Sequence, residues 1–186
     1  TLGTLSVGTG TLDLTGAGVT QSGTTITQAV GAGQFTVNAG AGVITLGNAS
    51  NVIRGSISLN NSGANAVTIN NSIGLDFAAS TLGNNLTSTT TGAITQSGAL
   101  TVGGTSSFSV GANAITLNNA SNVFSSTVAL TNSGANNVAL RDSGALTLGT
   151  LSVGTGTLDL TGVGVTQSGT TITQAVGAGQ FTVNAG

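Results

Sequence analysis

Charged side chains are almost absent from this chain of 186 residues, of which they make up 3%. A typical soluble domain is about one-quarter charged. The charged residues are Asp13, Arg54, Asp76, Arg141, Asp142 and Asp159. The formal net charge of −2 leaves no basic patch, which argues against binding to nucleic acid or to anionic lipid.

Cysteine, histidine, glutamate and lysine are missing, and so are proline, methionine, tryptophan and tyrosine. The absence of cysteine excludes disulfides and thiolate metal sites. No run of about 18 apolar residues occurs, so we expect no membrane insertion of this segment as a helix. The chain lacks an initiator methionine and begins and ends within a repeat, so we interpret it as a fragment of a longer array.

Glycine, with 31 residues, and internal repetition are what the chain has in abundance. Residues 1–40 return at 147–186 with one change, Val163 in place of Ala17, which defines a long period of 146. This long period is itself double. ITLGNASNV at 44–52 returns as ITLNNASNV at 115–123. TQSG recurs at 20–23, 95–98 and 166–169, so the long period divides into two unequal steps, of 75 and 71.

Apolar and polar residues alternate in short stretches, as in Ile57 and Leu59 or Val67 and Ile69, separated by clusters of glycine, asparagine and serine. Alternation with period two predicts short strands with one buried face. Glycine and asparagine favour sharp corners between them. No sustained helical stripe is present, and threonine, valine, asparagine and glycine are poor helix formers.

Units of this size cannot bury an apolar face alone, but they can when stacked. We therefore predict an all-β fold, a single-stranded right-handed parallel β-helix in which 1–186 is one continuous β-solenoid. We place the coils, of about 21–27 residues, so that six of them fill the long period. The expected coil starts are Val19, Val43, Val67, Ile94, Ile115, Val138 and Val165.

No catalytic residue can be assigned. Asp13 and Asp159 hold the same repeat position and should lie six coils apart, while Asp76 is isolated. We expect Arg141 and Asp142 to form a solvated corner or a local ion pair. Serine and threonine have no histidine or lysine base to activate them. The segment GTGTLD resembles part of a calcium-binding nonapeptide but recurs only once per long period, so we predict no metal and no cofactor.

Three other features have structural interpretations. Phe35, Phe108 and Phe181 are evenly spaced along the sequence, which suggests core filling in every third coil. Recurrent asparagines, such as Asn51 with Asn122, are expected to satisfy backbone groups at corners. An ice-binding face would need a regular T-x-T in every coil, and the sequence does not contain one.

Several long runs resemble a known family: GAITQSGALTVGG at 92–104, ITLNNASNVFSSTVALTNSGANN at 115–137 and LTLGTLSVGTGTLDLTGVGVTQSG at 146–169. They are similar to the passenger repeats of large bacterial exoproteins of the filamentous-haemagglutinin type, secreted by the two-partner route or as autotransporters. The resemblance implies a β-helical shaft that is extracellular, on a bacterial cell surface. It transfers no binding residue and no receptor.

Three functions follow as hypotheses. The first is the non-enzymatic shaft of a secreted or cell-surface adhesin, which provides length and rigidity. The second is a self-assembling extracellular filament or surface-layer subunit. The third is a polysaccharide-active β-helix enzyme, which the missing acidic cluster disfavours. The expected partners are neighbouring coils of the same chain, with end-to-end or lateral self-association into fibres.

Overall fold

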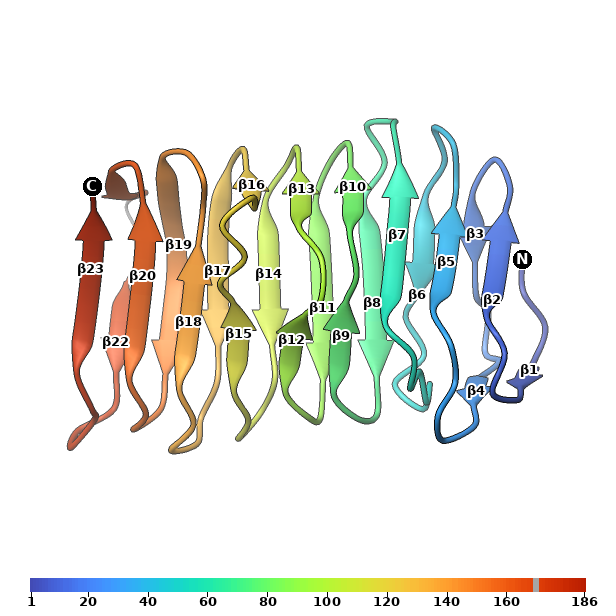
Figure 1. Ribbon diagram of the computed structural model, residues 1–186, viewed down its shortest axis with the longest axis horizontal. Coiled ribbons are helices and arrows are strands. Elements are labelled where there is room, and N and C mark those ends of the chain that lie inside the picture. Colours follow the sequence, from blue (N-terminus) through green and yellow to red (C-terminus); the bar gives the residue numbers. More distant parts are fainter. Residues whose placement is uncertain (169–170) are drawn as a thin grey trace.

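The chain folds into two facing β-sheets whose strands alternate along the sequence (Figure 1). This computed structural model describes residues 1–168 and 171–186. The backbone forms a β-solenoid of about nine turns. In Figure 1 the chain rises along the front sheet and descends along the back sheet as it advances from the N-terminus, so the winding is right-handed. The predicted fold class is confirmed.

The first sheet, in front in Figure 1, contains twelve strands. They are β2 (Leu12–Thr15), β5 (Phe35–Asn38), β7 (Ile57–Asn61), β9 (Leu75–Phe77), β10 (Ser80–Leu82), β12 (Ile94–Gln96), β13 (Leu100–Val102), β15 (Ile115–Leu117), β16 (Val123–Phe124), β18 (Val138–Arg141), β20 (Leu158–Gly162) and β23 (Phe181–Ala185). In the middle of the rod the first-sheet strand of each turn is interrupted. β9 and β10 belong to one turn, β12 and β13 to the next, and β15 and β16 to the turn after that.

The second sheet, behind the first, contains nine strands. They are β3 (Val19–Thr20), β6 (Ile44–Leu46), β8 (Val67–Asn71), β11 (Leu86–Thr90), β14 (Ser106–Ser109), β17 (Thr127–Thr131), β19 (Leu146–Val153), β21 (Val165–Gln167) and β22 (Ile172–Gln174). The remaining strands, β1 (Leu5–Val7) and β4 (Ile26–Gln28), pair with each other. No helix that could cross a membrane occurs among the described residues.

Adjacent strands are parallel, and each residue lies against its counterpart one turn away. The length of a turn varies along the rod: it is short where Val67 pairs with Leu86, and long where Val19 pairs with Ile44. Seven steps lead from Leu12 in β2 to Leu158 in β20, through β5, β7, β9, β12, β15 and β18. The long period therefore spans seven turns.

The prediction of six turns was wrong because two of the expected units are longer than one turn. Each contains three crossings from one sheet to the other, whereas a complete turn contains two. Val67 lies in β8 of the second sheet, whereas Ile94, the next expected start, lies in β12 of the first. The chain between them makes one and a half turns. The same holds between Val138 in β18 and Val165 in β21. A strand signal alone does not reveal to which of two similar sheets the strand belongs.

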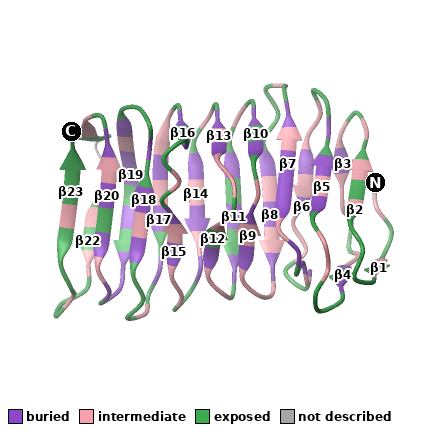
Figure 2. Cartoon of the chain, viewed as in Figure 1, coloured by how far each residue is buried: buried purple, intermediate pink, exposed green. Residues whose placement is uncertain are grey.

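The core is a continuous apolar column between the sheets. Alternate residues of each strand point inward, so Ile57 and Leu59 of the first sheet meet Val67 and Ile69 of the second, and all four are fully buried. Figure 2 shows this burial along the middle strands and its loss at β23. In the central turns the rings of Phe77, Phe108 and Phe124 pack edge to face, with centroids 6.2 and 6.3 Å apart.

The shorter repeat, about half of the long period, corresponds to three and a half turns. Ile44 in β6 belongs to the second sheet, and its counterpart Ile115 in β15 belongs to the first. Seven sheet-to-sheet crossings separate these strands, by way of β7, β8, β9, β11, β12 and β14. The same sequence therefore lies alternately on opposite sides of the rod, which gives the solenoid an approximate two-fold screw relation.

The phenylalanine spacing follows this screw relation. Phe35 and Phe108 are buried, as predicted, but they lie in different sheets and are three and a half turns apart. Phe181, in the terminal strand β23, is 45% exposed. The expectation of one such ring in every third coil is therefore wrong in its spacing, and Phe181 lies at the end of the core, where it is only partly covered.

Candidate functional site

The carboxylates noted in the sequence are spread along the rod. Asp13 and Asp159 are exposed on the first sheet and lie seven turns apart, about 34 Å at roughly 4.8 Å per turn. Asp76 is half-buried in β9 and accepts hydrogen bonds from the hydroxyls of Thr95 at 2.9 Å and Ser97 at 2.5 Å. Because Asp13, Asp76 and Asp159 are each separated from the others by at least three turns, they cannot act as a pair.

The corner at Arg141 and Asp142 differs from the expectation. Arg141 is exposed, but Asp142 is only 3% exposed. Its Oδ1 accepts the backbone N–H groups of Phe124 at 3.4 Å and Gly144 at 3.2 Å. The prediction of a solvated carboxylate was wrong, because this side chain turns inward after β18 and caps backbone donors. Among the described residues no group of three or more His, Cys, Asp or Glu could hold a metal ion.

Buried amide side chains close two corners of the solenoid. Asn51 is fully buried, accepts the backbone N–H of Ile26 at 2.9 Å and donates to Gln21 Oε1 at 3.0 Å. Asn122 is also fully buried and donates to Gln96 Oε1 at the same distance of 3.0 Å. These contacts confirm that the asparagines satisfy corner groups. Because the two clusters lie three and a half turns apart, they do not stack on each other.

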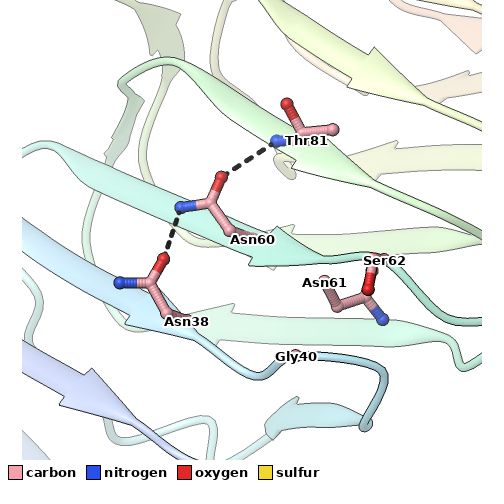
Figure 3. A pocket seen from close by; sticks show the side chains of 6 residues that line it. All are labelled: Asn38, Gly40, Asn60, Asn61, Ser62 and Thr81. Carbon is pink, nitrogen blue, oxygen red and sulfur yellow. Dashed lines mark hydrogen bonds between the residues drawn. The ribbon is translucent and has the colours of Figure 1, made fainter.

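A shallow hollow of about 300 Å³ lies on the first sheet beside β5, β7 and β10 (Figure 3). Its lining consists of Asn38, Gly40, Asn60, Asn61, Ser62 and Thr81. All of these groups are neutral amides, hydroxyls or backbone. Such a lining can hydrogen-bond a neutral polyhydroxylated molecule, but it contains no group that could serve as a general acid or base near neutral pH.

Asn60 is the centre of this hollow, and its amide is already engaged. Its Nδ2 donates to Asn38 Oδ1 and to Ser58 Oγ, both at 3.1 Å, and its Oδ1 accepts the Thr81 N–H at 3.3 Å. Figure 3 shows the contacts from Asn38 through Asn60 to Thr81, which run from strand to strand. The amides therefore act as a surface ladder that links three turns.

The hollow could not be predicted from the sequence because its residues are far apart in the chain. Asn38 is paired with Asn60, and Asn60 with Thr81, so each partner lies one turn further along. The only signal in the sequence is this spacing of about one turn, and it becomes visible once the register is known.

Hydroxyl groups form two rows on the outer face of the second sheet, one of which runs from Thr20 through Thr45 and Thr68 to β11 and β14. Thr87 and Thr89 in β11 lie beside Ser107 and Ser109 in β14. Ala129 in β17 interrupts one row, and an asparagine in β8 interrupts the other. Within the described residues no more than two successive turns carry hydroxyls at both positions, which is too short for an ice-like lattice.

These features define a class: a repeat protein whose turns stack into a parallel β-solenoid rod. Residues 1–60, 64–131 and 135–186 each match a family model described as repeats of unknown function (DUF5649). The chain belongs to this family. The matches begin at residues 1, 64 and 135, so one family repeat corresponds to about three and a half turns. No curated protein and no solved structure matches the chain.

Proposed function

We propose that this chain is a non-enzymatic shaft segment of a secreted bacterial surface protein of the adhesin type, which provides length and rigidity. The observation that carries the proposal is the identical register of the two copies of one coil. Leu12 pairs with Phe35 in the first copy, and Leu158 pairs with Phe181 in the second, seven turns further on. The sequence thus repeats with the rod, as expected where length is the selected property.

The physical properties of the rod agree with this role. Each turn contacts only its neighbours, so added turns lengthen the solenoid without rebuilding its core. The central turns bury long apolar columns, which favours stiffness. Trypsin-like proteases would have only Arg54 and Arg141 as cleavage sites, although both are exposed. The resemblance to filamentous-haemagglutinin-type passengers supports an extracellular, cell-surface location for the shaft.

The proposal is tested in the bacterium that makes the full protein. Antibodies raised against folded residues 1–186 should label intact cells, and immunogold particles should lie at a distance from the outer membrane. Deletion of one long period, residues 41–186, should bring a tag beyond the repeats closer to the cell by about 34 Å, at roughly 4.8 Å per turn. Labelling that requires permeabilised cells would exclude the proposed location, and an unchanged tag distance would exclude the spacer role.

A second candidate function is a self-assembling extracellular filament. It is favoured by the last strand, β23, where Phe181 is 45% and Val183 47% exposed beside an open sheet edge. In a filament, these groups would be covered by another copy. Sedimentation velocity of residues 1–186 across a concentration series separates the two candidates: long polymers at low micromolar concentration favour the filament, and a persistent monomer favours the shaft.

A further inference from the structure

One coil sequence occurs twice in this chain, once covered on both sides and once open on one side. Phe35 and Val37 in the first copy are fully buried. Their counterparts Phe181 and Val183, with the same neighbours in sequence, are 45% and 47% exposed. The contrast is visible in Figure 2, where β5 is largely buried and β23 is largely exposed. Block 147–186 therefore presents an uncovered copy of a face that is covered in block 1–40.

The structure also shows what covers that face. In the first copy, β7 lies in parallel register on β5, with Phe35 against Ile57 and Val37 against Leu59. The backbone N–H of Phe35 donates to Ser56 O at 2.8 Å. On the second sheet, β6 covers β3 in the same way. Residues 41–61 thus supply the matching surface for this coil on both sheets.

The fit depends on close backbone contacts at glycine. A Cβ placed on Gly55 would lie 1.9 Å from Gly33 O, and one placed on Gly42 would lie 2.4 Å from Gly18 N. Any larger residue at these positions would push the two turns apart. The counterparts of Gly33 and Gly18 in the open copy are Gly179 and Gly164, so the same contacts can form there.

The single difference between the two copies does not disturb this face. Ala17 is exposed in the first copy, and Val163, which replaces it, is 64% exposed in the second. Both side chains point to solvent. The Gly42 contact involves the backbone at residue 17, which a valine also supplies.

We propose that the open face of block 147–186 is a docking face for residues 41–61 of a second copy of this repeat, joined in series. Residues 41–186 then form a self-complementary unit of extension, seven turns long, whose two ends fit each other. The junction between the two copies would also have a sequence that already occurs within this chain, because FTVNAG precedes Ala41 at 35–40 and stands again at 181–186. This inference is independent of what the rod carries or where it is located.

The test is a tandem chain in which a second copy of residues 41–186 follows Gly186 of the complete chain. Hydrogen exchange in β23 is compared between the tandem and the single chain. Alternate amides of a parallel strand face opposite neighbours, and those of Phe35 and Ala39 donate to the following turn. We therefore expect the amides of residues 181, 183 and 185 to exchange rapidly in the single chain and to be protected in the tandem as strongly as those of residues 35, 37 and 39. We also expect small-angle scattering to show one rod, longer by about 34 Å at roughly 4.8 Å per turn.

A matched pair of variants tests whether the docking is specific. Gly55→Val in the second copy alone should restore rapid exchange in β23, because its Cβ would collide with the backbone at Gly179. Thr45→Val in the second copy exchanges one β-branched residue for another on the outer face of β6 and should leave the protection unchanged.

Two results would overturn the proposal. In the first, the second copy folds but the amides of β23 stay unprotected, so that the tandem consists of two separate folded bodies. In the second, the second copy stays unfolded. This result would contradict the proposal because residues 41–186 fold against the same coil sequence in the single chain. Equal protection of β23 in the Gly55→Val and Thr45→Val tandems would show that any following chain covers the face, which also contradicts specific docking.

Discussion

Asn71 and Asp142 occupy the same position in the shorter repeat, on opposite sides of the solenoid, and both are buried. Asn71 accepts the Ile53 N–H at 2.8 Å, and its Nδ2 donates to Ile53 O at 2.9 Å and to Gly74 O at 2.8 Å. Asp142 keeps the accepting contact, to the N–H of Phe124 at 3.4 Å. An ionised carboxylate cannot donate, so the carbonyls that correspond to those of Ile53 and Gly74 lose this partner.

We expect Asp142→Asn to raise the free energy of unfolding by about 1 kcal/mol, because the amide restores two donors at a buried corner. The reciprocal change, Asn71→Asp, should lower it by about 1–3 kcal/mol, since it removes both donors and buries a charge. Urea unfolding of the two variants and the parent chain measures both values. A destabilising Asp142→Asn would mean that this corner has become adapted to the carboxylate.

Phe35 and Phe181 occupy the same repeat position in a covered and an uncovered turn, so they allow the contribution of one phenylalanine ring to the free energy of unfolding to be compared. Phe35→Ala should cost about 3–5 kcal/mol, the usual value for a fully buried ring. Phe181→Ala should cost less than half of this, because the ring is already 45% exposed. Chemical unfolding at low protein concentration measures both. Equal costs would indicate that Phe181 is covered in solution, as it would be in an end-to-end assembly.

The sequence was sufficient to predict strands, corners and parallel stacking. Alternation, as at Ile57 and Leu59, requires one buried face, and frequent glycine-rich corners leave no room for helices. The number of turns could not be predicted in the same way. Ile44 and Ile115 have nearly the same neighbours in sequence yet belong to different sheets. The sequence period therefore corresponds to a whole number of half-turns, and the sequence does not show how many.

Individual side chains were harder to predict than the fold. The burial of Asp142 depends on backbone donors from the preceding turn, at Phe124, and these are invisible until the register is known. The hollow around Asn60 could not be predicted for the same reason. In both cases the partners lie about one turn away in the sequence, and the length of a turn is not constant along the rod.

Among the residues that the structure describes, two serine hydroxyls in the core have no hydrogen-bond partner. Ser88 and Ser106 are 1% and 2% exposed, and both Oγ atoms are unsatisfied. They lie in β11 and β14, where Ser88 pairs in register with Phe108. A buried hydroxyl without a partner costs about 1–3 kcal/mol.

We therefore expect Ser88→Ala and Ser106→Ala each to raise the free energy of unfolding by about 1 kcal/mol, since alanine keeps the volume small and removes the unsatisfied group. Ser107→Ala, half-buried on the outer face of β14, serves as the control and should change it by less than about 0.5 kcal/mol. Thermal and urea unfolding measure the series. Destabilisation by either core variant would reveal a partner such as a buried water.

Gly8 and Gly154 hold the same position in the two copies of the coil, but only Gly154 has a turn beneath it. A Cβ on Gly154 would lie 2.0 Å from Gly134 O, whereas one on Gly8 would meet nothing within 4 Å. Neither residue has the positive φ that disfavours alanine.

Gly154→Ala must therefore separate two turns, and we expect it to lower the free energy of unfolding by several kcal/mol, as overpacking of a core can do. Gly8→Ala should be neutral or slightly stabilising, because it reduces the entropy of the unfolded chain. Unfolding curves of the two variants test this directly, and equal stability of both would contradict the close stacking of turns at Gly134 and Gly154.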